Sequence, residues 1–352
     1  MVAPRLLSYP ATQTVFRRTR LARRDDLRGA YDGSMTSNQQ VATDSGHSAS
    51  SFSSPVLTIE KDAHLGWLWL DSPERRNAMG SDLWRDLPRA MQALSTDSDV
   101  RAVIIAAKGK SFTVGLDLKD SFLAGGATGG GGATGEGGAT GGGGATGGGG
   151  TANQDAPAGP PSQASQGIGR YREIKRLQDA ITSVAKCPKP TIAAVHGHCI
   201  GGGIDLITAC DIRIASQDAI FSVRETRVAI VADLGTLQRL PTIVGRGHAS
   251  ELAYTGKDID ANRAREIGLV NDVHEDATAV WVAAKQMAEQ IAANSPLAVL
   301  GTKAVLRCGE TMTVEQGLEY VAAWNAGMLM SNDLMEAMGA FLEKRPPNFK
   351  GS

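Results

Sequence analysis

The stretch KPTIAAVHGHCIGGGIDLITACDIRIAS, residues 189–216, limits the possible folds more than any other part of the chain. Within it, a short run rich in branched apolar residues is followed by a glycine turn, a helical segment and a second short strand. A run of this kind without polar alternation is typical of a strand buried on both faces. A similar run, AVIIAA, occupies residues 102–107. The sequence therefore predicts an α/β core.

Segments before and after this stretch continue the alternation of strand and helix. Alternating apolar residues on either side of residues 61–64 predict a hairpin of two strands. Residues 81–94 place their apolar side chains on one helical face, with Ser81 as the expected N-cap and Pro88 as a point of irregularity. From Leu234 onward the pattern is mostly helical, so we expect the strands to lie in the earlier part of the chain.

Composition divides the chain into parts. Residues 1–54 are rich in Ser, Thr, Gln and Arg without periodicity, which predicts a disordered or targeting segment. The core is expected over residues 55–257, interrupted at 124–167 by a Gly-Ala-Thr tract that runs into a Pro- and Gln-rich tail. Because such a tract offers few side chains for packing, we expect a flexible surface insertion. Residues 258–352 are expected to form a helical C-terminal region.

Charge and composition disfavour several classes of partner and location. A net charge of -1 gives no field that would recruit nucleic acid or an anionic membrane. The four cysteines form no C-x-x-C pair, which favours a reducing compartment. We expect a chain that is neither exported nor membrane-spanning, because it has no secretory segment and no apolar run of roughly 20 residues. The first 24 residues carry six arginines and no acid. They are either a mitochondrial matrix presequence or an over-extended start, as in a cytoplasmic bacterial protein.

Two glycine-containing loops each follow a buried strand: SFTVGLDL at 111–118 and GHCIGGGIDL at 197–206. Where a glycine turn begins a helix, backbone N–H groups lack partners and the helix dipole adds partial positive charge. Two such groups aimed at one point would make an oxyanion hole. The alternative is that Gly201, Gly202 and Gly203 only allow a strand and a helix to pack closely.

Three acids, Asp205, Glu225 and Asp233, follow the second loop. Together with RRNAM at 75–79 and GTLQRLPTIVG at 235–245, these loops and acids resemble the crotonase, or enoyl-CoA hydratase/isomerase, superfamily over nearly the whole ordered chain. The resemblance implies a ClpP-like α/β fold of repeated ββα units with a helical C-terminal trimerisation region. It also implies a homotrimer or a dimer of trimers.

The resemblance further implies where an acyl-CoA thioester would bind. The thioester oxygen would be held by the backbone N–H groups of Val114 and Gly202. Other substrate-binding positions carried over are Ala78, Gly115, Leu116, Asp117, Leu118, Gly203 and Lys344. Coenzyme A is part of the substrate, so no separate cofactor and no metal site are expected. Lys344 is either a contact to CoA phosphates or a solvated helix end, where a cation suits the dipole.

Within the superfamily, the acids most resemble those of delta(3,5)-delta(2,4)-dienoyl-CoA isomerases of fatty-acid beta-oxidation. Enoyl-CoA hydratases have two glutamates where this chain has Asp205 and Glu225, and no acid where it has Asp233. The resemblance implies that Glu225 removes a proton at C2, that Asp233 delivers one at C6, and that Asp205 orients or tunes the pair. Burial beside other carboxylates would raise the pKa of Asp233, as a proton donor requires.

Several alternatives remain open from sequence. Asp233 could instead cap the helix that follows it. The chain could be an enoyl-CoA hydratase, or an RNA-binding relative, which its near-neutral charge disfavours. His196 and His198 are expected to be structural or hydrogen-bonded loop residues, and Trp324 is expected to pack in the core or a trimer interface.

Overall fold

The computed structural model describes residues 52–117, 119 and 162–352, and within them the predicted α/β core is confirmed. Most of the predicted N-terminal segment and of the glycine-rich insertion lies outside the described residues. The insertion was expected to extend to residue 167, but residues 163–167 already form the start of helix α3.

Six strands form the main sheet, in the order β1-β2-β3-β4-β6-β9. The pair β1–β2 is the predicted antiparallel hairpin, and every other neighbouring pair is parallel. The strands are β1 (Leu57–Asp62), β2 (Leu65–Leu70), β3 (Ala102–Ala107), β4 (Thr191–Val195), β6 (Ile212–Ser216) and β9 (Asp272–His274). All residues of β3 and β4 are buried, as expected for strands covered on both faces.

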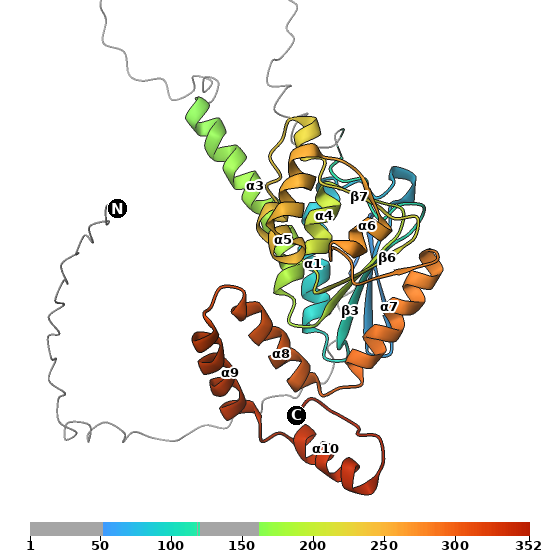
Figure 1. The fold of residues 1–352 in the computed structure, drawn as a ribbon, viewed down its shortest axis with the longest axis vertical. Helices are drawn as coiled ribbons and strands as arrows, with labels where there is room; N and C mark the ends of the chain where they lie inside the picture. Colours follow the sequence, from blue (N-terminus) through green and yellow to red (C-terminus); the bar gives the residue numbers. More distant parts are fainter. Residues whose placement is uncertain (1–51, 118, 120–161) are drawn as a thin grey trace, which may run out of the picture. The chain divides into compact units, whose positions relative to one another are not determined.

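Helices cover both faces of this sheet (Figure 1). Because side chains alternate along a strand, Val103 and Ile105 join one apolar cluster with α1 and α3–α5, whereas Ile104 joins another with α7. The covering helices are α1 (Ser81–Thr96), α3 (Gln163–Lys186), α4 (Gly202–Thr208), α5 (Thr236–Thr255) and α7 (Ala277–Ala292). The two clusters make a three-layered core with the sheet in the middle.

Helix α1 differs from expectation at its start. Gly80 is the N-cap, without a side-chain cap, and Ser81 is the first helical residue. The predicted cap is therefore one position too late. Pro88 lies inside the helix, which the structure describes as one continuous element, so the predicted irregularity does not divide it.

A second, smaller sheet carries the glycine loop of the candidate site. It contains β5 (His198–Ile200), β7 (Ile220–Ser222) and β8 (Ile259–Asp260), in the order β5-β7-β8. Gly201 follows β5 with φ 53° and leads directly into α4. This small sheet therefore brings the N-terminus of α4 next to the short 3-10 helix η2 (Glu225–Val228), which comes soon after β7.

The boundary predicted at residue 258 is wrong, because the chain after it still contributes to the core. Strand β8 pairs with β7, β9 pairs with β6 at the edge of the main sheet, and α7 covers that sheet. Between these strands lies α6 (Ala261–Glu266). The purely helical region begins only at α8 and comprises α8 (Pro296–Gly309), α9 (Val314–Met328) and α10 (Asn332–Glu343).

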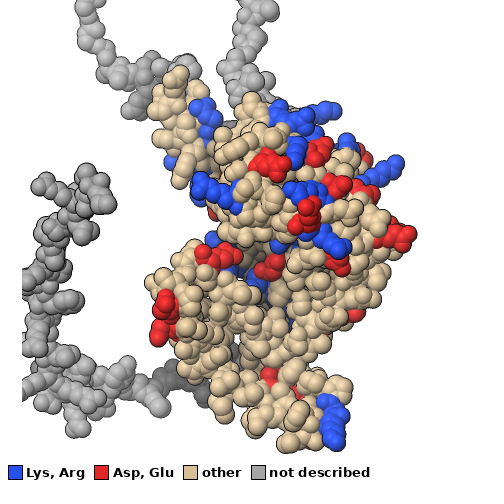
Figure 2. Space-filling model, in the orientation of Figure 1, with Lys and Arg blue, Asp and Glu red and all other residues tan. Residues whose placement is uncertain are grey.

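Few contacts join α8–α10 to the core. One of them is made by the buried side chain of Lys303. Lys303 on α8 donates to the carbonyl oxygen of Lys189 at 2.8 Å and to Asp211 Oδ2 at 2.6 Å. On the face shown in Figure 2, charged side chains gather over the core and few lie over α8–α10. Among the described helices, none is long and apolar enough to cross a membrane.

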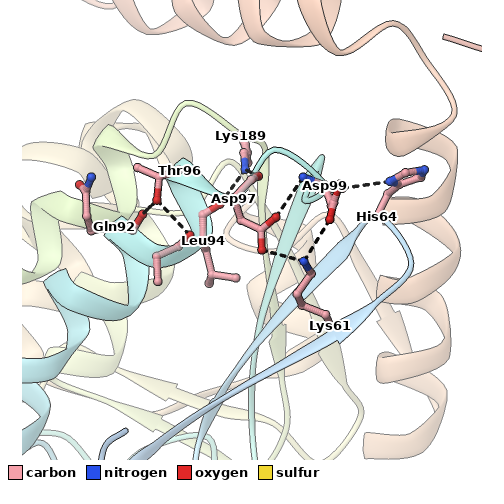
Figure 3. Close-up of polar contacts among 9 residues, drawn as sticks. Lys61, His64, Gln92, Leu94, Thr96, Asp97, Asp99 and Lys189 are labelled. Atoms are coloured by element: carbon pink, nitrogen blue, oxygen red, sulfur yellow. Dashed lines mark hydrogen bonds and ion pairs between the residues drawn. The ribbon is translucent and has the colours of Figure 1, made fainter. Parts of the chain in front are cut away.

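The C-terminal end of α1 is joined to the β1–β2 hairpin and to the segment before β4 by paired charges (Figure 3). Lys189 Nζ donates to the carbonyl oxygens of Leu94 and Asp97 at the end of α1. Asp97 also accepts from Lys61 of β1 at 2.7 Å. Because Lys189 lies two residues before β4, these contacts fix where the strand that leads to the glycine loop begins.

Candidate active site

The loop at 111–117 is held between two other segments by backbone hydrogen bonds. Thr113 donates to the carbonyl oxygen of His198 at 2.8 Å, and Ile200 donates to that of Thr113 at 3.1 Å. On the other side, Met79 donates to the carbonyl oxygen of Gly115 at 2.8 Å. The two glycine loops and the RRNAM segment therefore form one backbone assembly, although they are far apart in sequence.

Close approach explains why glycines occur in this assembly. A Cβ atom on Gly115, which has φ +85°, would lie 2.7 Å from the carbonyl oxygen of Ile200. A Cβ on Gly202 would lie 2.7 Å from Met79 Sδ, and one on Gly203 would lie 2.6 Å from Thr113 Cγ2. The packing role considered from sequence is thus real for Gly202 and Gly203, and it leaves the N–H group of Gly202 available for a second role.

The hydrogen-bond partners decide which N–H groups can bind an oxyanion. Gly202 is the first residue of α4, and its N–H group has no acceptor among the described residues. Val114, the other predicted donor, already donates to the carbonyl oxygen of Arg76 at 3.3 Å. Leu116 has no such acceptor among the described residues. A Cβ atom on its neighbour Gly115 would lie 3.6 Å from the nitrogen of Gly202. Leu116, directly after Gly115, is therefore the candidate for the second donor in this loop.

Glu225 reaches the same place from η2. Its Oε1 lies 3.4 Å from the position that a Cβ on Gly201 would take. Its Oε2 is buried and has no hydrogen-bond partner among the described residues. Burial raises the pKa of Glu225, and the charge of Asp233 raises it further. A buried carboxylate oxygen without a partner is costly, so its position beside the glycine turn at the start of α4 makes Glu225 a candidate for proton transfer.

Asp205 lies in the first turn of α4, as predicted, and is 1% exposed. Its Oδ1 accepts from the N–H of Thr236, the first residue of α5, at 2.6 Å. Burial raises the pKa of Asp205 to about 7, and the nearby charge of Glu225 contributes in the same direction. Asp205 therefore both caps the start of α5 and adds a titrating group behind Glu225.

Asp233 lies in the connection from η2 to α5. It does not cap α5, because Gly235 is the N-cap residue and the side chain that accepts from the first turn of this helix is that of Asp205. Partial burial raises the pKa of Asp233. The predicted apolar surroundings hold only in part, since Ala232 and Leu234 are buried whereas Val231 is 72% exposed.

Two residues not expected from the sequence hold the Asp233 segment in place. Gln178 on α3 donates from Nε2 to the carbonyl oxygen of Asp233 at 2.7 Å. Arg239 on α5 folds back so that its Nη1 donates to the carbonyl oxygen of Leu234 at 3.3 Å. A Cβ on Gly235, which has φ +127°, would meet that guanidinium at 1.9 Å. The three acids thus form an electrostatic chain, Asp205 to Glu225 to Asp233, with its last member held by α3 and α5.

Comparison with known proteins agrees with this geometry. The family model described as enoyl-CoA hydratase/isomerase matches residues 60–128 and 164–352. The chain belongs to the enoyl-CoA hydratase/isomerase family.

Relatives of this family match over most of their length. The peroxisomal delta(3,5)-delta(2,4)-dienoyl-CoA isomerase of Arabidopsis thaliana is 41% identical over 84% of this chain and 95% of its own. The mitochondrial enzyme of the same name from Rattus norvegicus is 39% identical over 82% of this chain and 80% of its own. Among solved structures, an enoyl-CoA hydratase from Bacillus anthracis superposes with a TM-score of 0.69 and 28% identity. It covers 84% of this chain and 100% of its own. The predicted crotonase fold is confirmed.

The remaining predicted substrate-binding residues of this family member lie in different parts of the molecule. Ala78 lies in the turn after Arg75, and Asp117 is 8% exposed and forms an ion pair with Arg75. Leu118 lies outside the described residues. Lys344 is exposed and ends α10 with φ 57°, and no described contact joins it to the acids. Its role at CoA phosphates stays a prediction.

The two histidines and Trp324 were expected to have structural roles, and their surroundings differ. His196 is buried, with Nε2 2.9 Å from the carbonyl oxygen of Gly109 and its ring against Trp281. His198 lies in β5 and is exposed. Trp324 packs against Gly301, between α9 and α8. Within the part of the chain that the structure describes, no group of His, Cys, Asp and Glu side chains could hold a metal ion.

Proposed function

We propose that this protein isomerises 3,5-dienoyl-CoA thioesters to 2,4-dienoyl-CoA thioesters in fatty-acid beta-oxidation. The observation that carries the proposal is the chain of three acids with raised pKa values, of which Asp205 is buried and Glu225 and Asp233 are partly buried, next to the free N–H group of Gly202. The names of the relatives from Arabidopsis thaliana and Rattus norvegicus support it.

The reaction moves one proton and two double bonds. Glu225, as the carboxylate, removes a proton from C2, and the electron pair spreads over the thioester and the diene. Asp233, in its protonated form, then donates a proton to C6, which leaves double bonds at C2 and C4. C2 and C6 lie several ångströms apart, so two acids serve better than one. A pKa raised toward neutrality suits both groups, because each must exchange protons near neutral pH.

Backbone donors stabilise the charge that develops on the thioester oxygen. We propose Gly202 and Leu116 as this pair, with Leu116 in place of Val114, whose N–H group is used by Arg76. Loss of one such donor typically costs about 3 to 4 kcal/mol of barrier. Asp205 would act as a positioning residue, because it fixes the start of α5 and titrates beside Glu225.

Two variants test the division of labour between the acids. Asp233→Asn should abolish the rise in ultraviolet absorbance from a conjugated dienoyl thioester, yet still exchange the C2 protons of 3,5-octadienoyl-CoA in D2O. Glu225→Gln should lose both the absorbance change and the exchange. Undiminished isomerisation by Asp233→Asn would remove this residue from the mechanism. Faster hydration of crotonyl-CoA than isomerisation by the wild type would favour an enoyl-CoA hydratase instead.

We also propose that α8–α10 assemble the protein into a homotrimer or a dimer of trimers. Large apolar side chains are exposed on or beside these helices: Leu306, Val314, Leu318, Met330, Phe341 and Leu342. Such an apolar surface is typical of a subunit interface. Light scattering that gives the mass of a monomer at micromolar concentration would contradict the proposal.

Lys344 would contact CoA phosphates in this assembly. The change Lys344→Ala should then raise KM for a CoA ester and leave kcat largely intact, and an unchanged KM would count against the contact. The compartment also stays a proposal: the relatives are named mitochondrial or peroxisomal, and the arginine-rich segment lies outside the described residues.

A further inference from the structure

The hydroxyl oxygen of Thr236 is one of five buried side-chain atoms that have no hydrogen-bond partner among the described residues. Thr236 is the first residue of α5 and is 0% exposed. Its backbone N–H donates to Asp205 Oδ1 at 2.6 Å. Any residue except proline would supply that N–H, so the cap at the start of α5 does not require a hydroxyl. A buried hydroxyl without a partner costs free energy, and its presence at this position needs a reason.

The side chain of Thr236 acts on the carboxyl group of Asp205. Burial has the largest influence on the pKa of Asp205 and raises it, whereas the Thr236 side chain has the next largest influence and lowers it. A hydrogen bond to the ionised form of an acid has this sign, because it favours the charged state. The hydroxyl is therefore close enough to serve the carboxylate, and its proton can rotate about the C–O bond to reach it.

The other groups that face Asp205 come from elements around α4. Glu225 of η2 raises the pKa of Asp205 and Arg239 of α5 lowers it, each by less than the Thr236 side chain. Cys199 of β5 stays neutral, because burial raises the pKa of its thiol. Helices α4 and α5 lie side by side (Figure 1). Among the described residues no cation forms an ion pair with Asp205, so the Thr236 side chain is the strongest influence that favours its ionised form.

A hydroxyl group can serve a carboxyl group in both of its protonation states. It donates to a carboxylate and accepts from a carboxylic acid, whereas a backbone N–H only donates and a carbonyl oxygen only accepts. Asp205 in turn acts on Glu225, because the charge interaction between two acids is mutual and they titrate as a pair. Glu225 Oε2 is also buried and without a partner. Asp205 therefore lies between two residues that each keep an unpartnered buried oxygen.

We propose that the hydroxyl of Thr236 is a positioning group that holds the carboxyl of Asp205 in both protonation states, donating to it when it is ionised and accepting from it when it is protonated. By setting how readily Asp205 ionises, Thr236 controls the negative charge beside Glu225 and so the proton affinity of that acid. The effect on catalysis rests on the proposed function, because it takes Glu225 as the base at C2. The contact between Thr236 and Asp205 does not depend on that function.

Unfolding of Thr236→Val tests the contact without a substrate. Valine keeps the shape and the N–H group but lacks the hydroxyl. Because this donor favours the ionised acid, its loss should raise the pKa of Asp205 by about one pH unit, as expected for a hydrogen bond to a charged group. The folded variant then holds its proton to higher pH, so its stability keeps falling where that of the wild type levels off. Thr236→Val should therefore lose more stability relative to the wild type at pH 8 than at pH 5.

Two further variants separate ionisation from packing in the same measurement. In an Asp205→Asn background, the difference between Thr236 and Thr236→Val should not change with pH, because asparagine cannot ionise. Thr236→Ala also lacks the hydroxyl but leaves more space, so it should show the same pH dependence on a larger overall loss. A loss in Thr236→Val that is equal at pH 5 and pH 8 would mean that the hydroxyl only packs, and it would overturn the proposal.

The pH dependence of turnover tests the effect on Glu225. The ionisation of Asp205 should appear near pH 7 in kcat/KM for 3,5-octadienoyl-CoA. It should move up by about one pH unit in Thr236→Val, return in Thr236→Ser and be absent in Asp205→Asn. Thr208→Val is the matched control: Thr208 is a buried threonine of α4 whose hydroxyl donates to the carbonyl oxygen of Ile204 at 2.7 Å, so its loss should leave the profile unchanged.

The two measurements can fail separately. A pH-dependent loss of stability in Thr236→Val with an unshifted kcat/KM profile would overturn the control of Glu225 by Thr236. The same loss in a protein that isomerises no 3,5-dienoyl-CoA would keep the contact with Asp205 and remove the proposed reaction.

Discussion

Carboxyl groups in two regions of this molecule have pKa values that are shifted in opposite directions. At the end of α1, Asp97 accepts a hydrogen bond from Lys61, which lowers the pKa of the carboxyl group (Figure 3). In the candidate site, burial raises the pKa values of Asp205, Glu225 and Asp233, and none of the three forms a described ion pair. The first region gains stability from its charges, whereas the second gives up stability to keep three groups that can exchange protons.

This contrast separates structural from functional carboxylates without reference to relatives. A paired carboxylate prefers to be ionised, so it is poorly suited to donate a proton at neutral pH. A buried, unpaired one holds its proton longer and exchanges it in the range where a general acid or base works best. Variants that remove this difference between the two regions, one side chain at a time, test the contrast.

The largest expected effect is the loss of turnover when a candidate acid becomes an amide. Glu225→Gln removes the proposed base and should lower kcat for 3,5-dienoyl-CoA by about 10²- to 10⁴-fold, the range typical of general base catalysis. The matched change in the other region, Asp97→Asn, should leave kcat within about twofold. A similar loss in both variants, measured by absorbance of the conjugated product, would show that the contrast does not report function.

The second effect concerns stability against pH. The folded state binds the proton of Asp205 more tightly than the unfolded chain, because burial raises this pKa from 3.8 to about 7. The contribution of Asp205 is therefore most favourable below about pH 4 and falls as the pH rises toward 7. Asp205→Asn cannot ionise and still offers an acceptor to Thr236, so it should be more stable than the wild type at pH 8, by up to about 4 kcal/mol.

Denaturant unfolding at pH 5, 6.5 and 8 would measure this difference. The advantage of Asp205→Asn should shrink as the pH falls. An advantage that is equal at the three values would mean that a property other than ionisation separates the variant from the wild type.

A third prediction tests the segment that presents Asp233. Gly235→Ala places a side chain at φ +127° and against the guanidinium of Arg239, so it should cost about 1 to 3 kcal/mol and reduce isomerisation. Gly247, also in α5, has nothing within 4 Å of its Cβ position. Gly247→Ala should be neutral or slightly stabilising in thermal unfolding. If both variants unfold at the same temperature, the backbone at Gly235 is not strained by a side chain.

The sequence predicts the parts of this fold whose residues carry their own periodicity. Strands β3 and β4 are recognisable because both faces are covered, and the long helices because their apolar residues recur on one face. Strands β8 and β9 have two and three residues, too few for any period, so the pattern after residue 258 predicts helices alone. Most of the fold was thus predictable, and the boundary of the helical region was not.

The candidate site likewise contains residues that the sequence predicts and residues that it does not. The three acids could be proposed from their positions after the glycine loop, and the structure brings them into one electrostatic chain. Which backbone N–H group is free could not be predicted, because Val114 is occupied by Arg76, a partner from another segment. Gln178 was missed because it lies 55 residues from Asp233 and donates to a main-chain oxygen, which no side-chain motif reveals.

The smallest expected effect comes from the paired region itself. Lys61→Met removes the partner of Asp97, but the lysine side chain is 42% exposed, so solvent already screens the pair. The loss in free energy of unfolding should be below about 1 kcal/mol at pH 7 and smaller still in high salt. Because pairing lowers the pKa of Asp97, this contribution exists above about pH 4 and disappears as the carboxylate is protonated, the opposite of Asp205. Unfolding of Lys61→Met and wild type at pH 3 and pH 7 checks the sign, and a difference that grows toward acid would contradict it.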